Sequence, residues 1–196
     1  MGGENLYPVD LPRISIRDGE AILQIGYEDL IKFHGYNMIG GVALAYKIML
    51  WGIPKLTDQV PQRGKFYFYS GIGPGGQGVI DAVEMVLRVK THDRLGLDKA
   101  YSMDKPGAYC PGGGHYYFEI GYENRKLCLG VKEGMIPAEF IRMSELAGKR
   151  AQTGETLTPE ETAYLHRLRY QLSEAIIAAD PDDLFFEISC EEVVGD

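Results

Sequence analysis

The sequence contains few cysteines, and their spacing limits the metal sites that the chain can build. Only three occur in 196 residues, Cys110, Cys128 and Cys190, and none forms a Cys-x-x-Cys pair. A zinc ribbon therefore cannot be built from these thiolates alone. An odd number of cysteines in a chain without a secretory signal predicts free thiols. We expect Cys128 and Cys190 to be packing residues.

Long hydrophobic runs and basic clusters are also missing. No segment approaches the roughly 18 uncharged apolar residues that would cross a bilayer, and the N-terminus lacks the charged and apolar regions of a signal peptide. The net charge is −8, which argues against a nucleic-acid partner because phosphate binding depends on clustered Lys and Arg. The sequence predicts a cytoplasmic protein that binds neither membranes nor nucleic acid.

The acidic excess is concentrated near the C-terminus. Seven acidic residues and no basic residue occur between Asp180 and Asp196, so we expect this segment to be a solvated edge. With 45% hydrophobic residues, the chain can bury one substantial core. We predict an α+β core over residues 1–135, and a helical hairpin with an acidic tail over residues 136–196. This second part would pack on the core or on a dimer partner.

Apolar spacing and turn residues predict the order of elements. The expected elements are a hairpin over residues 13–25, a helix that stops at Gly52 and Pro54, a strand over 65–72, a helix over 79–88, strands over 115–120 and 126–131, and helices over 137–150 and 159–179. The segment Thr158-Pro-Glu-Glu161 is a capping box with proline at the first helical position. This order favours the α+β class: an antiparallel or mixed sheet packed with helices, plus a C-terminal helical hairpin.

The last predicted helix carries a narrow apolar stripe. Its members are Leu165, Leu168, Leu172 and Ile176. Their three- and four-residue spacing suits packing on one partner helix. The simplest interpretation is an antiparallel hairpin within the chain, and the next is a homodimer contact.

The most informative segment lies between Asp29 and Met49, where a short helix breaks at a His-Gly pair and a second helix begins with glycines. The break places the His34 imidazole at an irregular part of the backbone, and the adjacent Tyr36 and Asn37 could face an enclosed space. Imidazole binds transition metals and titrates near neutral pH, so His34 is a candidate metal ligand or acid-base group. The alternative is a histidine that caps the break by hydrogen bonding.

A glycine-rich loop lies between the predicted strand and helix of residues 65–88. The segment Gly71-Ile-Gly-Pro-Gly-Gly76 formally satisfies Gly-x-Gly-x-x-Gly, and its place would aim backbone N–H groups at an anion. The candidate ligand-binding residues are Gly73, Gly75, Gly76 and Gly78. No βαβ repeat follows, which weakens a dinucleotide interpretation. Otherwise the glycines permit a tight turn and close packing.

A second candidate loop joins Cys110 to His115 through Pro-Gly-Gly-Gly. The flexible spacer could let thiolate and imidazole converge on one cation, and the alternative is a glycine hairpin with a buried thiol and an exposed imidazole. Five tyrosines are expected near the pocket: Tyr67, Tyr69, Tyr109, Tyr116 and Tyr117. Tyrosine stacks on planar ligands, so a pterin or porphyrin is a hypothesis, although strand propensity alone could produce these residues.

Two motifs, together with the C-terminal helices, resemble the FmdE family of formylmethanofuran dehydrogenase proteins over nearly the whole chain. Residues 33–40, Phe-His-Gly-Tyr-Asn-Met-Ile-Gly, look like its Phe-His-Gly-His-x-Cys-Pro-Gly motif, and residues 78–82, Gly-Val-Ile-Asp-Ala, are similar to its Cys-x-x-Asp-Ala motif. The chain departs from the family at Tyr36, Met38 and Gly78, which replace a histidine and two cysteines, and it lacks a zinc-finger appendage. The resemblance implies the fold, a pocket that includes Asp81, and association with a redox enzyme. Charge at a helix start could explain Asp81 instead.

These observations lead to three hypotheses of function. In the first, a pocket binds a divalent transition metal, zinc above others, or a metal-containing cofactor, with His34, Cys110 and His115 as metal ligands. In the second, a metal-free protein or enzyme binds a small molecule or anion and uses His34 as an acid-base group. In the third, the chain is a non-catalytic assembly subunit.

Overall fold

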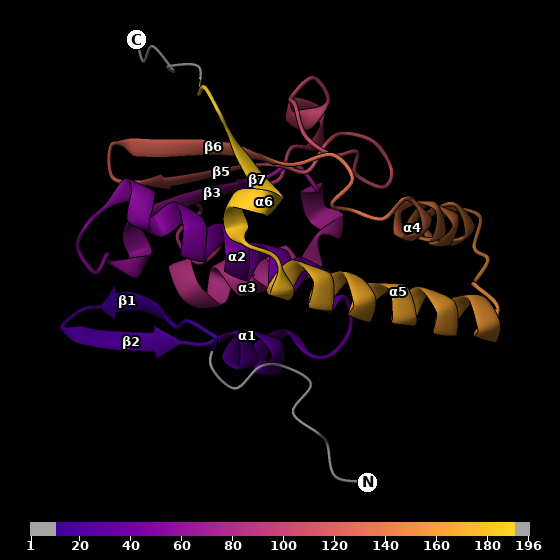
Figure 1. The fold of residues 1–196 in the computed structure, drawn as a ribbon, viewed down its shortest axis with the longest axis horizontal. Coiled ribbons are helices and arrows are strands. Elements are labelled where there is room, and N and C mark those ends of the chain that lie inside the picture. The colour runs from indigo at the N-terminus through magenta and orange to yellow at the C-terminus, as the bar shows by residue number, and fades with distance from the viewer. Residues whose placement is uncertain (1–10, 191–196) are drawn as a thin grey trace, which may run out of the picture.

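The computed structural model describes residues 11–190 of the chain (Figure 1). The helices are α1 (Tyr27–His34), α2 (Ile39–Leu56), α3 (Gln77–Leu87), α4 (Ala138–Gln152), α5 (Pro159–Ala178) and α6 (Pro181–Leu184). The strands are β1 (Ile14–Asp18), β2 (Ala21–Ile25), β3 (Phe66–Ser70), β4 (Leu95–Gly96), β5 (Tyr117–Tyr122), β6 (Arg125–Val131) and β7 (Phe185–Ile188). Short 3-10 turns are η1 (Arg63–Lys65), η2 (Gly73–Gly75) and η3 (Lys99–Ser102).

The strands form a mixed sheet and a separate hairpin. The larger sheet has the order β4-β3-β5-β6-β7. Strand β4 is parallel to β3, whereas the pairs β3–β5, β5–β6 and β6–β7 are antiparallel. Figure 1 shows α2 and α3 between this sheet and the β1–β2 hairpin. Helices packed with a mixed sheet confirm the predicted α+β class.

Alternating side chains give the larger sheet two different faces. Phe66 and Phe68 of β3 are fully buried in the core, together with Phe118 of β5. Tyr67 and Tyr69 alternate with these phenylalanines, so they lie on the opposite face. The sheet therefore presents an apolar face to the helices and an aromatic, hydroxyl-bearing face to the other side.

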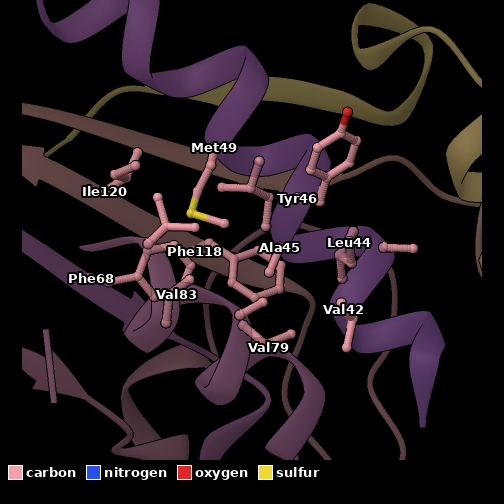
Figure 2. Close-up of a cluster of buried hydrophobic side chains, with 14 of the residues drawn as sticks. Val42, Leu44, Ala45, Tyr46, Met49, Phe68, Val79, Val83, Phe118 and Ile120 are labelled. Carbon is pink, nitrogen blue, oxygen red and sulfur yellow. The ribbon is translucent and has the colours of Figure 1, made fainter. Parts of the chain in front are cut away.

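Helix α2 is the central helix of the core. Figure 2 shows its side chains among those of α3 and the sheet: Val42, Leu44, Ala45, Tyr46, Met49, Phe68, Val79, Val83, Phe118 and Ile120. Among residues 11–190, α2 is the helix that has the length and composition to cross a membrane, but 72% of it is buried inside the fold. Its place in the core accounts for its apolar sequence, since a helix that is apolar on all sides is a buried one.

Helix α2 continues beyond the stop that the sequence predicted. The expected end at Gly52 and Pro54 is wrong, because the helix runs to Leu56 and is capped at Thr57. A Cβ on Gly52 would lie 3.1 Å from a methyl of Ile120, so this glycine lets the helix lie close to the sheet. Pro54 falls in the last turn, and burial of the helix outweighs the hydrogen bond that the proline removes.

The other local predictions in the first half of the chain are confirmed. The hairpin pairs β1 with β2 in antiparallel register, and its turn includes Gly19 with φ at +59°, a conformation that glycine adopts without strain. The predicted strand, glycine loop and helix are present as β3, η2 and α3. The β5–β6 pair turns at Glu123-Asn124, as expected.

Both predicted C-terminal helices are present. The amide of Glu161 donates to Thr158 Oγ1 over 3.2 Å, and the amide of Thr158 donates to the Glu161 carboxylate over 2.8 Å. This reciprocal pair confirms the capping box that starts α5. Figure 1 shows α5 along its length and α4 almost end-on, so the two helices cross at a steep angle.

The apolar stripe of α5 packs on two partners rather than one. Leu165 and Leu168 cluster with Met143 of α4. Leu172 and Ile176 join the main core that contains α2. The stripe therefore joins α4 to the rest of the fold within a single chain.

The acidic segment after α5 adds structure that the sequence analysis did not predict. Its acidic side chains are exposed, as expected for a solvated edge, but the backbone forms α6 and then β7, which pairs with β6. Phe185 is buried in the core, and Glu187 forms a 2.6 Å ion pair with Lys55 of α2. Residues 191–196 lie outside the described part of the chain. The segment over residues 185–188 completes the sheet of the predicted core.

The prediction of free thiols is wrong for two of the three cysteines. Cys128 on β6 is bonded to Cys190, with 5.5 Å between their Cα atoms, a usual separation for a disulfide. The sequence analysis treated them as packing residues because the pairing of β6 with the C-terminal segment was not foreseen. Cys110 is a free and buried thiol.

Candidate functional site

The His34 break is built by two unusual backbone positions. Helix α1 ends at His34, and Gly35 follows with φ at +91°. Met38 takes the left-handed conformation, with φ at +57°, just before α2 begins. Because non-glycine residues rarely adopt positive φ, contacts with the surrounding structure must hold Met38 in place.

His34 supplies such contacts through both of its ring nitrogens. Nδ1 lies 2.7 Å from Asp81 Oδ2, and Nε2 contacts the carbonyl oxygen of Asn37. The imidazole is only 6% exposed. Since both nitrogens already face acceptors, the geometry matches the expected alternative in which His34 caps the break by hydrogen bonding.

The neighbours of His34 contribute little to an enclosed site. The side chains of Tyr36 and Asn37 are exposed. Asp81 was expected in the first turn of its helix, but α3 begins at Gln77, which places Asp81 at the start of the second turn. Its carboxylate also accepts a hydrogen bond from the Gln77 side chain, so Asp81 joins α3 to the break.

The Cys110–His115 segment is a glycine turn. Gly112, Gly113 and Gly114 all have positive φ, and the Cys110 amide donates to the Gly114 carbonyl over 3.0 Å. Burial raises the pKa of the Cys110 thiol to about 11, which keeps it protonated at neutral pH. His115 Nδ1 lies 3.2 Å from the backbone oxygen of Ser102.

The predicted zinc ligands are not brought together. Within residues 11–190, no three His, Cys, Asp or Glu side chains form a group that could hold a metal ion. His34 is committed to Asp81, whereas Cys110 and His115 belong to the glycine turn. These residues do not fit a zinc ion, and zinc binding stays a prediction from the sequence.

The main candidate site is a cavity of about 410 Å³ between the starts of α2 and α3 and the inner sides of α4 and α5. Its volume falls within the usual range for small-molecule sites. The apolar part of its wall includes Leu44, Ile72, Val79, Ile136, Phe140, Leu172 and Ile176. Cys110 and Gly75, Gly76 and Gly78 also line it, while Gly73 does not. Part of the predicted glycine loop therefore faces an enclosed space.

The N-terminal ends of two helices meet at this cavity. Gly40 and Gly41 of α2 line it beside Gly76 and Gly78 of α3. A Cβ on Gly41 would lie only 3.1 Å from the Val79 amide nitrogen, so the helices approach each other at their backbones. Neither helix has an acidic residue in its first turn or a side-chain cap. Such uncapped ends carry partial positive charge.

Two cationic side chains complete the lining. Arg169 of α5 and Lys99 of η3 reach the cavity, and no Asp or Glu lines it. The ammonium of Lys99 donates to the Pro111 carbonyl over 3.0 Å. Within the part of the chain that the structure describes, Arg169 has no hydrogen-bond or ion-pair partner for its guanidinium. Burial lowers its pKa from the ordinary value, yet an arginine remains charged at neutral pH.

The tyrosines expected around one pocket are divided between two places. Tyr116 is buried against the main cavity, whereas Tyr67 and Tyr69 line a second cavity on the other face of the sheet. Tyr117 is buried beside that second group, and Tyr109 is exposed. No single tyrosine-lined cleft for a pterin or porphyrin is formed by these five residues.

Arg169 and Lys99 were missed as site residues in the sequence analysis. A usable signal exists for Arg169: it lies four residues after Leu165 and three before Leu172, which places it on the apolar side of α5. Lys99 has no such signal, because its position depends on the loop between β4 and β5.

No protein-family model matches the chain, and no curated protein sequence matches it. The resemblance to the FmdE family therefore stays a prediction based on the sequence motifs. What the structure adds is an α+β fold that encloses a largely apolar cavity with two cations in its wall.

Proposed function

We propose that the chain binds a small amphipathic anion in the 410 Å³ cavity. The ligand would place a carboxylate or phosphate near Arg169 and Lys99, and an apolar body against the side chains of α2 and α5. This is the small-molecule hypothesis of the sequence analysis without a catalytic role for His34. The observation that carries the proposal is the Arg169 guanidinium, a charge without a described partner in an apolar wall.

The energetics of an unpaired charge support an anionic ligand. A charged group that loses water without gaining a partner is destabilising, so buried charges in proteins are normally paired. The cavity wall offers no carboxylate to pair with Arg169. A bound anion would supply that partner, and the uncapped starts of α2 and α3 add favourable potential for negative charge.

The apolar majority of the wall indicates the rest of the ligand. An inorganic anion alone would leave Leu44, Phe140 and Leu172 without contacts. Burying a hydrocarbon against them is favourable by roughly 25 cal/mol per Å² of apolar surface. We therefore expect a medium-length acyl or aromatic acid to bind more tightly than phosphate.

The experiment compares octanoate, octanol and inorganic phosphate by isothermal titration calorimetry. Octanoate is expected to bind most tightly, because it alone has both the charge and the apolar body. Arg169→Met should weaken octanoate about tenfold to hundredfold, since hydrogen bonds to a charged group contribute about 1.5–3 kcal/mol. Arg167→Met is the matched control, because Arg167 is exposed on the same helix.

Two results would count against the proposal. If octanoate does not bind, or if octanol binds equally well to both the wild type and Arg169→Met, the cavity does not select a charged head group. Equal losses in Arg169→Met and Arg167→Met would indicate a general charge effect rather than a contact inside the cavity.

The remaining predictions concern metal, partners and location. Metal uptake, homodimer formation and association with a redox enzyme stay predictions from the sequence. The cytoplasmic location is also a proposal, and the Cys128–Cys190 bond is of a kind that is rare in reducing compartments. Trapping the thiols in cells at once on lysis, before air oxidation, would decide whether this bond exists there.

A further inference from the structure

A second cavity, of about 480 Å³, lies on the tyrosine-bearing face of the large sheet. Its wall includes Tyr67, Tyr69, Asp98, Tyr101, Glu119 and Lys126. We propose that this cavity binds the substituted ammonium group of a small organic cation, held by the tyrosine rings and the Glu119 carboxylate. The inference is independent of the anion site, which is on the helix-covered side of the fold.

The tyrosine rings form a compact aromatic cluster. The rings of Tyr69 and Tyr101 meet edge to face at 5.0 Å, and both lie about 6 Å from the ring of Tyr117, at 5.9 and 6.1 Å. The faces of aromatic rings attract cations, and this attraction increases when water is excluded. The cluster already attracts one cation of the chain, because Lys105 Nζ lies 4.6 Å from the centre of the Tyr101 ring. Lys105 does not line the cavity itself.

Glu119 provides a buried negative charge at the same place. The residue is only 3% exposed. Its Oε1 accepts hydrogen bonds from the hydroxyls of Tyr117, at 2.7 Å, and Tyr101, at 2.9 Å. Its Oε2 is 3.4 Å from Lys126 Nζ, which is longer than a well-formed charge-assisted bond. An incoming ammonium would therefore find an oxygen with capacity to accept a closer contact.

The surrounding hydroxyls respond to this charge. Burial and then the Glu119 carboxylate raise the pKa of Tyr67 to about 12. The pKa of Tyr117 is also raised, by burial first and then by its hydrogen bond to Glu119. The tyrosines therefore stay neutral at physiological pH, so they act as hydrogen-bond donors and ring faces rather than as anions.

The charge of the wall favours a cation over other ligands. Two carboxylates, Asp98 and Glu119, face one ammonium, that of Lys126. An anion would be repelled, and a neutral apolar molecule would desolvate Glu119 without compensating it. A metal ion requires more acidic, His or Cys ligands than are grouped here, since residues 11–190 contain no such group of three. An organic ammonium fits both the rings and the carboxylate.

The test uses choline as the probe and calorimetry as the readout. Choline should bind the wild-type protein saturably at millimolar concentrations. Its uncharged isostere, in which carbon replaces the ammonium nitrogen, should bind at least about tenfold more weakly, because ring faces and carboxylate both act on the charge. Comparable binding of the two compounds, or no binding of choline, would overturn the proposal.

Variants place the probe at this cavity. Glu119→Gln keeps the shape of the side chain and should weaken choline about tenfold, whereas Glu123→Gln, on the exposed turn of the same hairpin, should leave it unchanged. Lys126→Gln removes the competing ammonium and should tighten binding. If Glu119→Gln fails to fold, Tyr101→Leu decides the matter: unchanged choline affinity in that variant contradicts the aromatic site. Octanoate binding should be unaffected throughout.

Discussion

Gly78 marks the point where α3 crosses the start of α2 at backbone contact, and this contact predicts the effect of adding one methyl group. A Cβ at Gly78 would lie 2.7 Å from the Met38 carbonyl oxygen and 3.0 Å from the Val42 amide nitrogen. Backbone atoms cannot rotate away as the end of a flexible side chain can. Gly78→Ala must therefore push the two helices apart.

The size of the effect follows from two opposing terms. Overpacking in a well-packed core costs about 1–3 kcal/mol. Alanine has a better helix propensity than glycine, which returns up to about 1 kcal/mol. The free energy of unfolding should fall by about 1–2 kcal/mol, and Tm by about 2–8 °C for a chain of this size. Thermal unfolding followed by circular dichroism measures the change.

The matched control is Gly148→Ala on α4. A Cβ there has no atom within 4 Å, so this substitution should gain the helix propensity alone and raise stability by up to about 1 kcal/mol. A Tm for Gly78→Ala equal to or above that of the wild type would refute the argument. The same contact explains why the cysteine of the resembled family motif is absent: Gly78→Cys would introduce the same Cβ.

Three further predictions concern a cap, a carboxylate and the disulfide. Thr158→Ala removes the cap of α5 and should cost about 1 kcal/mol in urea unfolding; no change would mean that the capping box contributes nothing. Burial opposes ionisation of Glu84, but hydrogen bonds from Thr91 and neighbouring amides outweigh it and lower the Glu84 pKa. This stabilisation is present above the carboxyl pKa of the unfolded chain and is lost as pH falls through the lower folded value, so Glu84→Gln should flatten the acid side of the stability profile. The bond between Cys128 and Cys190 closes a separation of 62 residues, so reduction should cost about 4 kcal/mol. Thiol titration of the unfolded, unreduced protein should find one thiol, that of Cys110, and three would contradict the disulfide.

Sequence reasoning predicted the parts of the fold that depend on neighbouring residues. The Asp18-Gly19 turn and the Thr158 capping box use side chains within a few positions of one another. The continuation of α2 past Pro54 depends instead on packing against the sheet. The pairing of β7 with β6 depends on residues more than fifty positions apart, so no local pattern could indicate it.

The candidate site was predicted in part for the same reason. The glycine loop after β3 and the thiol of Cys110 were selected from local patterns, and both line the main cavity. His34 was correctly placed at a backbone break, but its partner Asp81 comes from another helix. Arg169, on which the proposed function depends, reaches the cavity only because α5 folds back on α2.

The packing of α5 on α2 also determines when the protein can become stable during synthesis. Lys47 of α2 donates to the Ala179 carbonyl over 2.7 Å, and Trp51 donates to Asp182 over 2.7 Å. These partners are separated by more than 130 positions, and β7 is made later still. A nascent chain that ends before them exposes one side of its most apolar helix. Folding should therefore be completed only after translation has passed β7, and until then the chain should depend on chaperones to remain soluble.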